Sequence, residues 1–139
     1  MKKEEIVTLI IIGIILAIDI GTLAYTKKCV AKITGDLTEL EDEAVKYCNE
    51  EKNKKRLNDR NLELSSKSED IYKEWIRMSD ILTFYIEHDE LEKVNVQFER
   101  IIADYSVDSK EEVVPEIKEA IFILNHIEKK QRLTLRNVL

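Results

Sequence analysis

Proline and glycine are scarce in this chain of 139 residues, which contains one proline and three glycines. Because these residues build turns and linkers, neither a fold of many short strands nor two domains joined by a Pro- or Ser-rich linker is expected. After residue 25, only Gly35 and Pro115 interrupt the chain. The composition therefore predicts an all-α protein with one helical domain.

The motifs of common catalytic and cofactor sites are also missing. The chain has two cysteines but no C-x-x-C pair, and it has no Gly-rich phosphate loop, no H-E-x-x-H pair and no nucleophile elbow. We therefore expect a protein that is not an enzyme, with no catalytic residues, no cofactor, no metal and no identifiable small-molecule substrate.

Charged residues are abundant, but they form no basic stripe. The chain carries 22 basic and 28 acidic side chains, and the part after residue 25 carries 20 and 25. This balance predicts no nucleic-acid partner. It also argues against a domain that lies flat on an anionic lipid surface.

One long apolar run stands out against this polar background. Residues 6–25 read IVTLIIIGIILAIDIGTLAY, with one carboxylate and no basic side chain. At about 1.5 Å per residue the run is ~30 Å long, the thickness of a bilayer's hydrocarbon core, and it predicts a membrane-spanning helix. A cleaved signal peptide is the alternative, although its apolar region is normally about 7–15 residues long. We expect an uncleaved anchor that follows a short head, residues 1–5.

The predicted anchor has two different faces. Asp19 and Thr22 form a polar face, where a carboxylate costs about 2.5–3.5 kcal/mol at the helix centre and needs a partner, water, headgroups or a proton. The nearly opposite face is a stripe of small residues that lets a second helix approach closely in lipid. This small-residue face consists of Gly13, Ala17, Gly21 and Ala24. It predicts another membrane protein, or a second copy of the chain, as a partner within the lipid.

The remaining chain divides into a juxtamembrane segment, residues 26–35, and a helical domain, residues 36–139. Gly35 and Asp36 predict a break after the anchor. The polar stretch 49–61 is expected to be a turn with a frayed helix start. Apolar residues recur at steps of three and four over residues 37–48, 64–85, 91–105 and 117–127.

The last three stretches are joined by short connections, and each has one apolar face. They predict an antiparallel bundle of three to four helices behind one N-terminal transmembrane helix. Ser109 and Glu112 match a capping box for the last helix. Pro115 then either bends this helix or marks its true start near Val114.

The cysteines and histidines are the remaining candidates for chemistry. Cys29 and Cys48 would lie ~28 Å apart on an unbroken helix, so a disulfide needs a chain reversal near Gly35. A buried thiol at Cys48 is the favoured interpretation, and acylation of Cys29 is a weaker one. An antiparallel bundle places a group of titratable side chains at one corner, where they either form a metal or pH-sensing site or hydrogen-bond the helix ends. This candidate corner site consists of His88, Asp89, Glu90 and His126.

The second half of the chain resembles a known family. The resemblance lies in Trp75, in YIEHDEL at 85–91, in FER at 98–100, in AIFILNHI at 120–127 and in the ending LRNVL at 135–139. These segments are similar to domain-of-unknown-function family 4363, small single-span proteins mostly of spore-forming Firmicutes. The resemblance implies a helical protein anchored in a bacterial cytoplasmic membrane and supplies no activity. We expect the C-terminal domain to lie outside the cytoplasm, because long domains cross membranes largely regardless of charge.

The leading hypothesis is a non-enzymatic accessory subunit or adaptor. It would contact lipid and a partner protein through its span and would dock partners on its bundle. Two alternatives remain open, namely a self-associating coiled-coil scaffold of the cell envelope and a His-based metal or pH sensor.

Overall fold

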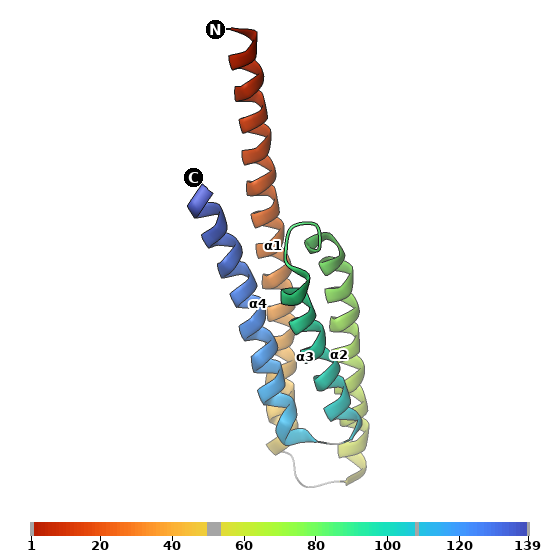
Figure 1. The fold of residues 1–139 in the computed structure, drawn as a ribbon. Coiled ribbons are helices and arrows are strands. Elements are labelled where there is room, and N and C mark those ends of the chain that lie inside the picture. Colours follow the sequence, from red (N-terminus) through yellow and green to blue (C-terminus); the bar gives the residue numbers. More distant parts are fainter. Residues whose placement is uncertain (1, 50–53, 108, 139) are drawn as a thin grey trace.

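The described residues fold into four α-helices and contain no strand. The computed structural model describes residues 2–49, 54–107 and 109–138. Figure 1 shows the helices α1 (Lys3–Asn49), α2 (Lys54–Leu82), α3 (His88–Ser106) and α4 (Lys110–Val138). The predicted all-α class is confirmed.

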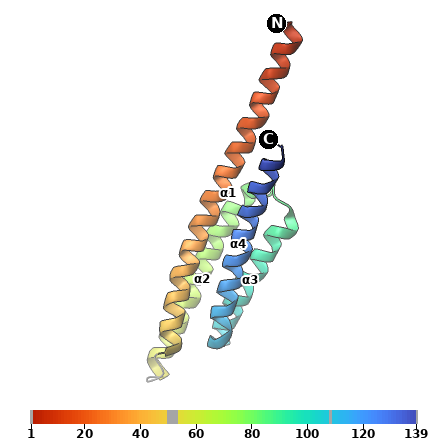
Figure 2. The ribbon, with the colours of Figure 1, turned by 90° about the vertical axis from the view of Figure 1, so that its left-hand side faces the viewer.

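The helices alternate in direction and close into a four-sided bundle. α1 packs against α2 and α4, and α3 packs against the same two helices, so each helix has two antiparallel neighbours (Figures 1 and 2). This is an up-and-down arrangement with one apolar face of each helix turned inward. The N-terminal half of α1 projects beyond the bundle as a single rod.

The break predicted at Gly35 and Asp36 is wrong, because α1 runs through both residues. An added Cβ at Gly35 would meet nothing within 4 Å, so this glycine faces open space. It costs the helix about 1 kcal/mol in propensity, which the burial of its neighbours Ile33 and Leu37 outweighs. Residues 26–35 are therefore helical and belong to the bundle. The buried positions of α1 are Thr26, Cys29, Val30, Ile33, Leu37, Leu40, Ala44 and Tyr47.

The core contains the residues that the helical spacing predicted. Trp75 and Phe98 are fully buried. The indole Nε1 of Trp75 donates to Asn95 Oδ1 over 2.8 Å, so this buried donor is satisfied. The rings of Tyr72 and Phe98 stack with centroids 5.1 Å apart. Aromatic side chains thus pack α2 against α3 in the core.

The sequence left two helix starts open. α2 begins at Lys54, inside the stretch expected to be a turn with a frayed helix start, and residues 50–53 of this stretch lie outside the described residues. α4 begins at Lys110 with Pro115 inside it, so the alternative start near Val114 is wrong. Proline leaves the carbonyl of Glu111 without its helical donor, and Glu111 lies exposed in the first turn, where water can supply one.

Candidate functional site

The projecting half of α1 is an apolar rod that the rest of the described chain does not cover. Its most apolar window of 18 residues has a mean hydropathy of 2.7, and none of these residues is fully buried. Ile10, Ile14 and Ile18 are each more than half exposed. The core helix of a soluble protein would be covered instead. This helix is long and apolar enough to cross a bilayer.

The structure treats the two faces of this rod differently. Asp19 and Thr22 are partly buried and lie on the face that continues into the buried positions of α1 at Thr26. The small-residue face is open, because an added Cβ at Gly13 or Gly21 would meet nothing within 4 Å. Ala17 and Ala24 are likewise exposed. The polar face thus turns toward the chain's own bundle, and the small-residue face turns away from it.

A tyrosine ties the turn between α2 and α3 to α1 where the rod leaves the bundle. The Tyr85 hydroxyl donates to the Thr22 carbonyl over 3.3 Å and lies 3.2 Å from the Thr26 hydroxyl. Thr22 itself donates to the Asp19 carbonyl over 2.9 Å. Burial raises the pKa of Tyr85, so its hydroxyl keeps the proton that it donates. The turn is therefore fixed at a defined level along α1.

The start of α3 and the end of α4 meet at this same end, as the antiparallel arrangement predicted. Lys130 Nζ lies 2.9 Å from Glu87 and 3.4 Å from Glu90, and Lys93 lies 3.3 Å from Glu90. Partial burial of Glu90 opposes its ionisation, but the two ammonium groups outweigh this and lower its pKa. The hydrogen bond to Glu87 raises the pKa of Lys130. The two ion pairs of Lys130 join the end of α4 to the start of α3, whereas the pair of Lys93 with Glu90 lies within α3.

The four residues of the candidate corner site are only partly brought together. Asp89, Glu90 and His126 line one groove between α3 and α4, whereas exposed His88 is not part of its lining. Within the described ranges, no three His, Cys, Asp or Glu side chains gather closely enough to hold a metal. His88 and His126 therefore do not share one site in the structure.

The groove between α3 and α4 is a feature that the sequence reasoning missed. It has a volume of about 770 Å³ and is lined by charged and apolar side chains. Phe122 on its wall is 66% exposed. Gln97 also lines it, and the buried Oε1 atom of Gln97 has no hydrogen-bond partner among the described residues. The available signal was Phe122, a large aromatic residue that lies off the apolar face of α4.

The structure also reverses the expectation for the two cysteines. Cys29 is the buried thiol, 1% exposed, whereas Cys48 is partly exposed. Burial raises the pKa of Cys29, and the hydrogen bond with the Tyr25 hydroxyl opposes this only in part. Because α1 is unbroken, Cys29 and Cys48 lie ~28 Å apart and cannot form a disulfide within one chain.

Fold and site together define a class of protein, a four-helix bundle whose first helix projects as an apolar rod of bilayer length. Within this class the chain belongs to the family described as Domain of unknown function (DUF4363), whose model matches residues 24–138. The resemblance seen from Trp75 onward is confirmed and extends over the whole bundle. No curated protein and no solved structure matches the chain.

Proposed function

We propose that this protein is a non-enzymatic accessory subunit or adaptor of a bacterial cytoplasmic membrane. Residues 6–25 form its single span, and the helical domain lies outside the cytoplasm. The observation that carries the proposal is the open small-residue face of α1, which lies opposite the polar face that turns toward the chain's own bundle.

The two faces have different consequences in lipid. A carboxylate on a bare helix disfavours insertion, but Asp19 is partly covered and lies only about two turns before the bundle begins. The polar face therefore needs no partner protein to cover its carboxylate. On the other face, residues without large side chains allow a second backbone to approach closely, and packing of this kind drives association in membranes. The small-residue face is thus the surface available to a partner span.

The groove between α3 and α4 supplies a second docking surface, outside the membrane. A large exposed ring such as Phe122 is typical of interface anchors. The side-chain Oε1 of Gln97 accepts no hydrogen bond from the described residues, so a partner in the groove could donate one to it. Phe122 and Gln97 therefore both favour a groove that is occupied by a protein partner.

In-membrane photocrosslinking tests the proposal. We expect a photoreactive residue at Ala17, on the small-residue face, to capture a discrete protein. The same residue at Ile15, on the opposite side of the helix, is expected to capture lipid only. Gly13→Ile/Gly21→Ile should abolish the capture, whereas Thr8→Ile, which adds bulk on the other face, should leave it unchanged. Equal capture from both positions, or capture that survives the double substitution, would contradict the proposal.

No specific observation favours either alternative. A coiled-coil scaffold needs a seam that stays free for a second copy, but the apolar seam of α1 from Ile33 to Tyr47 is covered by α2 and α4. A second copy that pairs through the small-residue face would instead appear in the crosslinking as a product of twice the chain's mass. A sensor needs coupled imidazoles, and His88 does not share the groove of His126.

A further inference from the structure

Positive charge is concentrated in the two segments that flank the exit of α1 from the bundle. Residues 26–35 and 129–139 contain seven basic and no acidic side chains, whereas residues 36–128 contain 13 basic and 25 acidic ones. The net charge of −6 for the whole chain conceals this separation. The seven basic residues are Lys27, Lys28, Lys32, Lys129, Lys130, Arg132 and Arg136.

The fold brings these two segments to the same end of the molecule. α4 runs antiparallel to α1 and ends beside the projecting rod (Figures 1 and 2). Lys130 is level with the turn between α2 and α3 through its contact with Glu87. The eight residues of α4 that follow Lys130 extend ~12 Å further along α1, at 1.5 Å per residue. The basic end of α4 therefore lies beside the part of the predicted span that is nearest to the bundle.

Four of these cations form no ion pair with the described residues. Lys27, Lys28, Lys129 and Arg136 are exposed, and the part of the chain that the structure describes offers them no ion pair. Lys27 lies only two residues, ~3 Å of helix, beyond the end of the predicted span. At physiological salt the Debye length is about 8 Å, so a charge at this distance feels the lipid surface with little screening.

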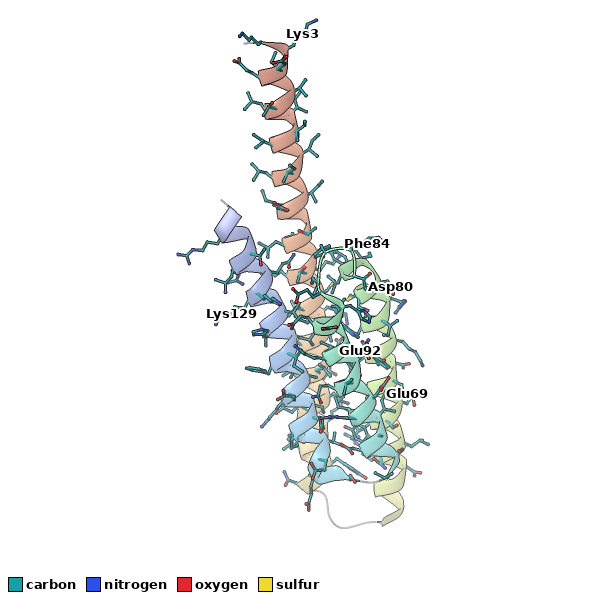
Figure 3. The ribbon with its side chains drawn as sticks, viewed as in Figure 1. Lys3, Glu69, Asp80, Phe84, Glu92 and Lys129 are labelled. Atoms are coloured by element: carbon teal, nitrogen blue, oxygen red, sulfur yellow. The ribbon has the colours of Figure 1, made fainter. Side chains whose placement is uncertain are left out.

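An exposed aromatic side chain completes this end of the bundle. Phe84 is 87% exposed and lies in the turn between α2 and α3, beside the point where α1 emerges (Figure 3). Its neighbour Tyr85 holds the turn to the Thr22 carbonyl of α1. Phe84 is therefore kept at the level where the apolar rod begins, which is the depth at which aromatic side chains gather in membrane proteins.

We propose that this end of the bundle is a lipid-binding surface for anionic phospholipids of the bilayer that α1 spans. The free lysine and arginine side chains contact lipid phosphates, and Phe84 inserts among the headgroups. Each basic residue near an anionic surface contributes about 1 kcal/mol, or roughly a fivefold preference. The inference rests on the proposed anchoring. It adds that the bundle contacts the bilayer through this end and that this end prefers anionic lipids.

Two exposed phenylalanines provide a matched test in the full chain. Phe84 lies at the membrane end, and Phe122, 66% exposed, lies along the side of α4. Each is replaced in turn by benzoylphenylalanine, and the protein is reconstituted in phosphatidylcholine vesicles with or without about one third phosphatidylglycerol. We expect lipid adducts from position 84 and few or none from position 122. In mixed vesicles the ratio of anionic to neutral lipid in the adducts should exceed the bulk ratio on the order of fivefold.

A charge variant separates lipid recognition from mere proximity. In this variant Lys27, Lys28, Lys129 and Arg136 are replaced by glutamine. The ratio of anionic to neutral lipid in the adducts at position 84 should then return to the bulk ratio. Because these side chains make no ion pair with the described residues, the bundle is expected to keep its helicity and thermal midpoint. The control replaces four exposed cations on the bundle flanks by glutamine and should keep the enrichment. These flank residues are Lys73, Arg77, Arg100 and Lys118.

Several outcomes would overturn the inference. Equal lipid labelling from positions 84 and 122, no anionic enrichment, or enrichment that survives the charge variant each contradicts a lipid-binding end. Protein adducts in place of lipid adducts at position 84 would assign this surface to a protein partner instead. Release of the wild-type chain by alkaline carbonate would refute the anchoring and this inference together, whereas an integral protein without lipid adducts at position 84 would refute this inference alone.

Discussion

Replacing Gly35 by alanine should stabilise the bundle. Gly35 lies in the middle of α1, its backbone is helical, and an added Cβ would meet nothing within 4 Å. The methyl group of alanine therefore fits without displacing any atom. Glycine has more conformational freedom than alanine in the unfolded chain, so Gly35→Ala lowers the entropy cost of folding.

The magnitude follows from this comparison. Alanine exceeds glycine by about 0.8–1.0 kcal/mol inside a helix, and measured substitutions at compatible sites give about 0.4–1 kcal/mol. We expect the free energy of unfolding to rise by about 0.5–1 kcal/mol. For a helical domain of 114 residues this corresponds to an increase of about 2–5 °C in the thermal midpoint.

Urea unfolding of the full chain in detergent micelles, followed by far-ultraviolet circular dichroism, measures the change. Gly21→Ala is the matched control, because Gly21 lies on the same helix with equally open space but outside the bundle. It should leave the bundle's midpoint unchanged. Gly35→Pro should lower the stability by about 3 kcal/mol or more, since proline removes a hydrogen bond inside the helix and its ring clashes with the preceding turn.

A destabilised Gly35→Ala protein would refute this reasoning. Alanine is unfavourable where a glycine holds a left-handed conformation or a close backbone approach, as a break at Gly35 would require. The sign of this one substitution therefore distinguishes a continuous α1 from a helix that ends at Gly35.

Three further predictions concern the core, the corner ion pairs and the thiols. Phe98→Ala should cost about 3–5 kcal/mol in urea unfolding, because it empties a fully buried site; a loss below 1 kcal/mol would contradict the packing. The lowered pKa of Glu90 means that its stabilisation is complete above the ordinary value of 4.5 and is lost as the pH falls through the folded-state value, so Glu90→Gln should flatten the acid limb of a stability profile. An unchanged acid limb would contradict the ion pair. Cys29 should resist maleimide in the folded protein and react once urea unfolds it, since its thiol is 1% exposed and its pKa is raised; rapid native labelling would show that this site opens.

Much of the fold could be predicted because helical periodicity is a local property. The apolar spacing identified the helical stretches, and short connections imposed antiparallel neighbours. The meeting of the start of α3 with the end of α4 then followed from topology, whereas the ion pairs of Lys130 with Glu87 and Glu90 were not predicted. The break predicted at Gly35 was wrong because a local helix breaker competes with burial, and of the two alternatives at Pro115 only the start near Val114 was wrong. Ile33 and Leu37 pack into the bundle and carry α1 through the glycine, and the exposed first turn of α4 tolerates the proline.

The sequence by itself determined that residues 6–25 form a helix of bilayer length and that the rest forms amphipathic helices, because length, hydropathy and period depend only on the order of residues. Only the tertiary structure decided which face of α1 is already occupied. Thr26 and Tyr85 lie 59 positions apart, and their contact turns the polar face toward the bundle and leaves the small-residue face open. Packing also joined the end of α4 to the base of the span, because charges distant along the chain gather only when helices fold against one another.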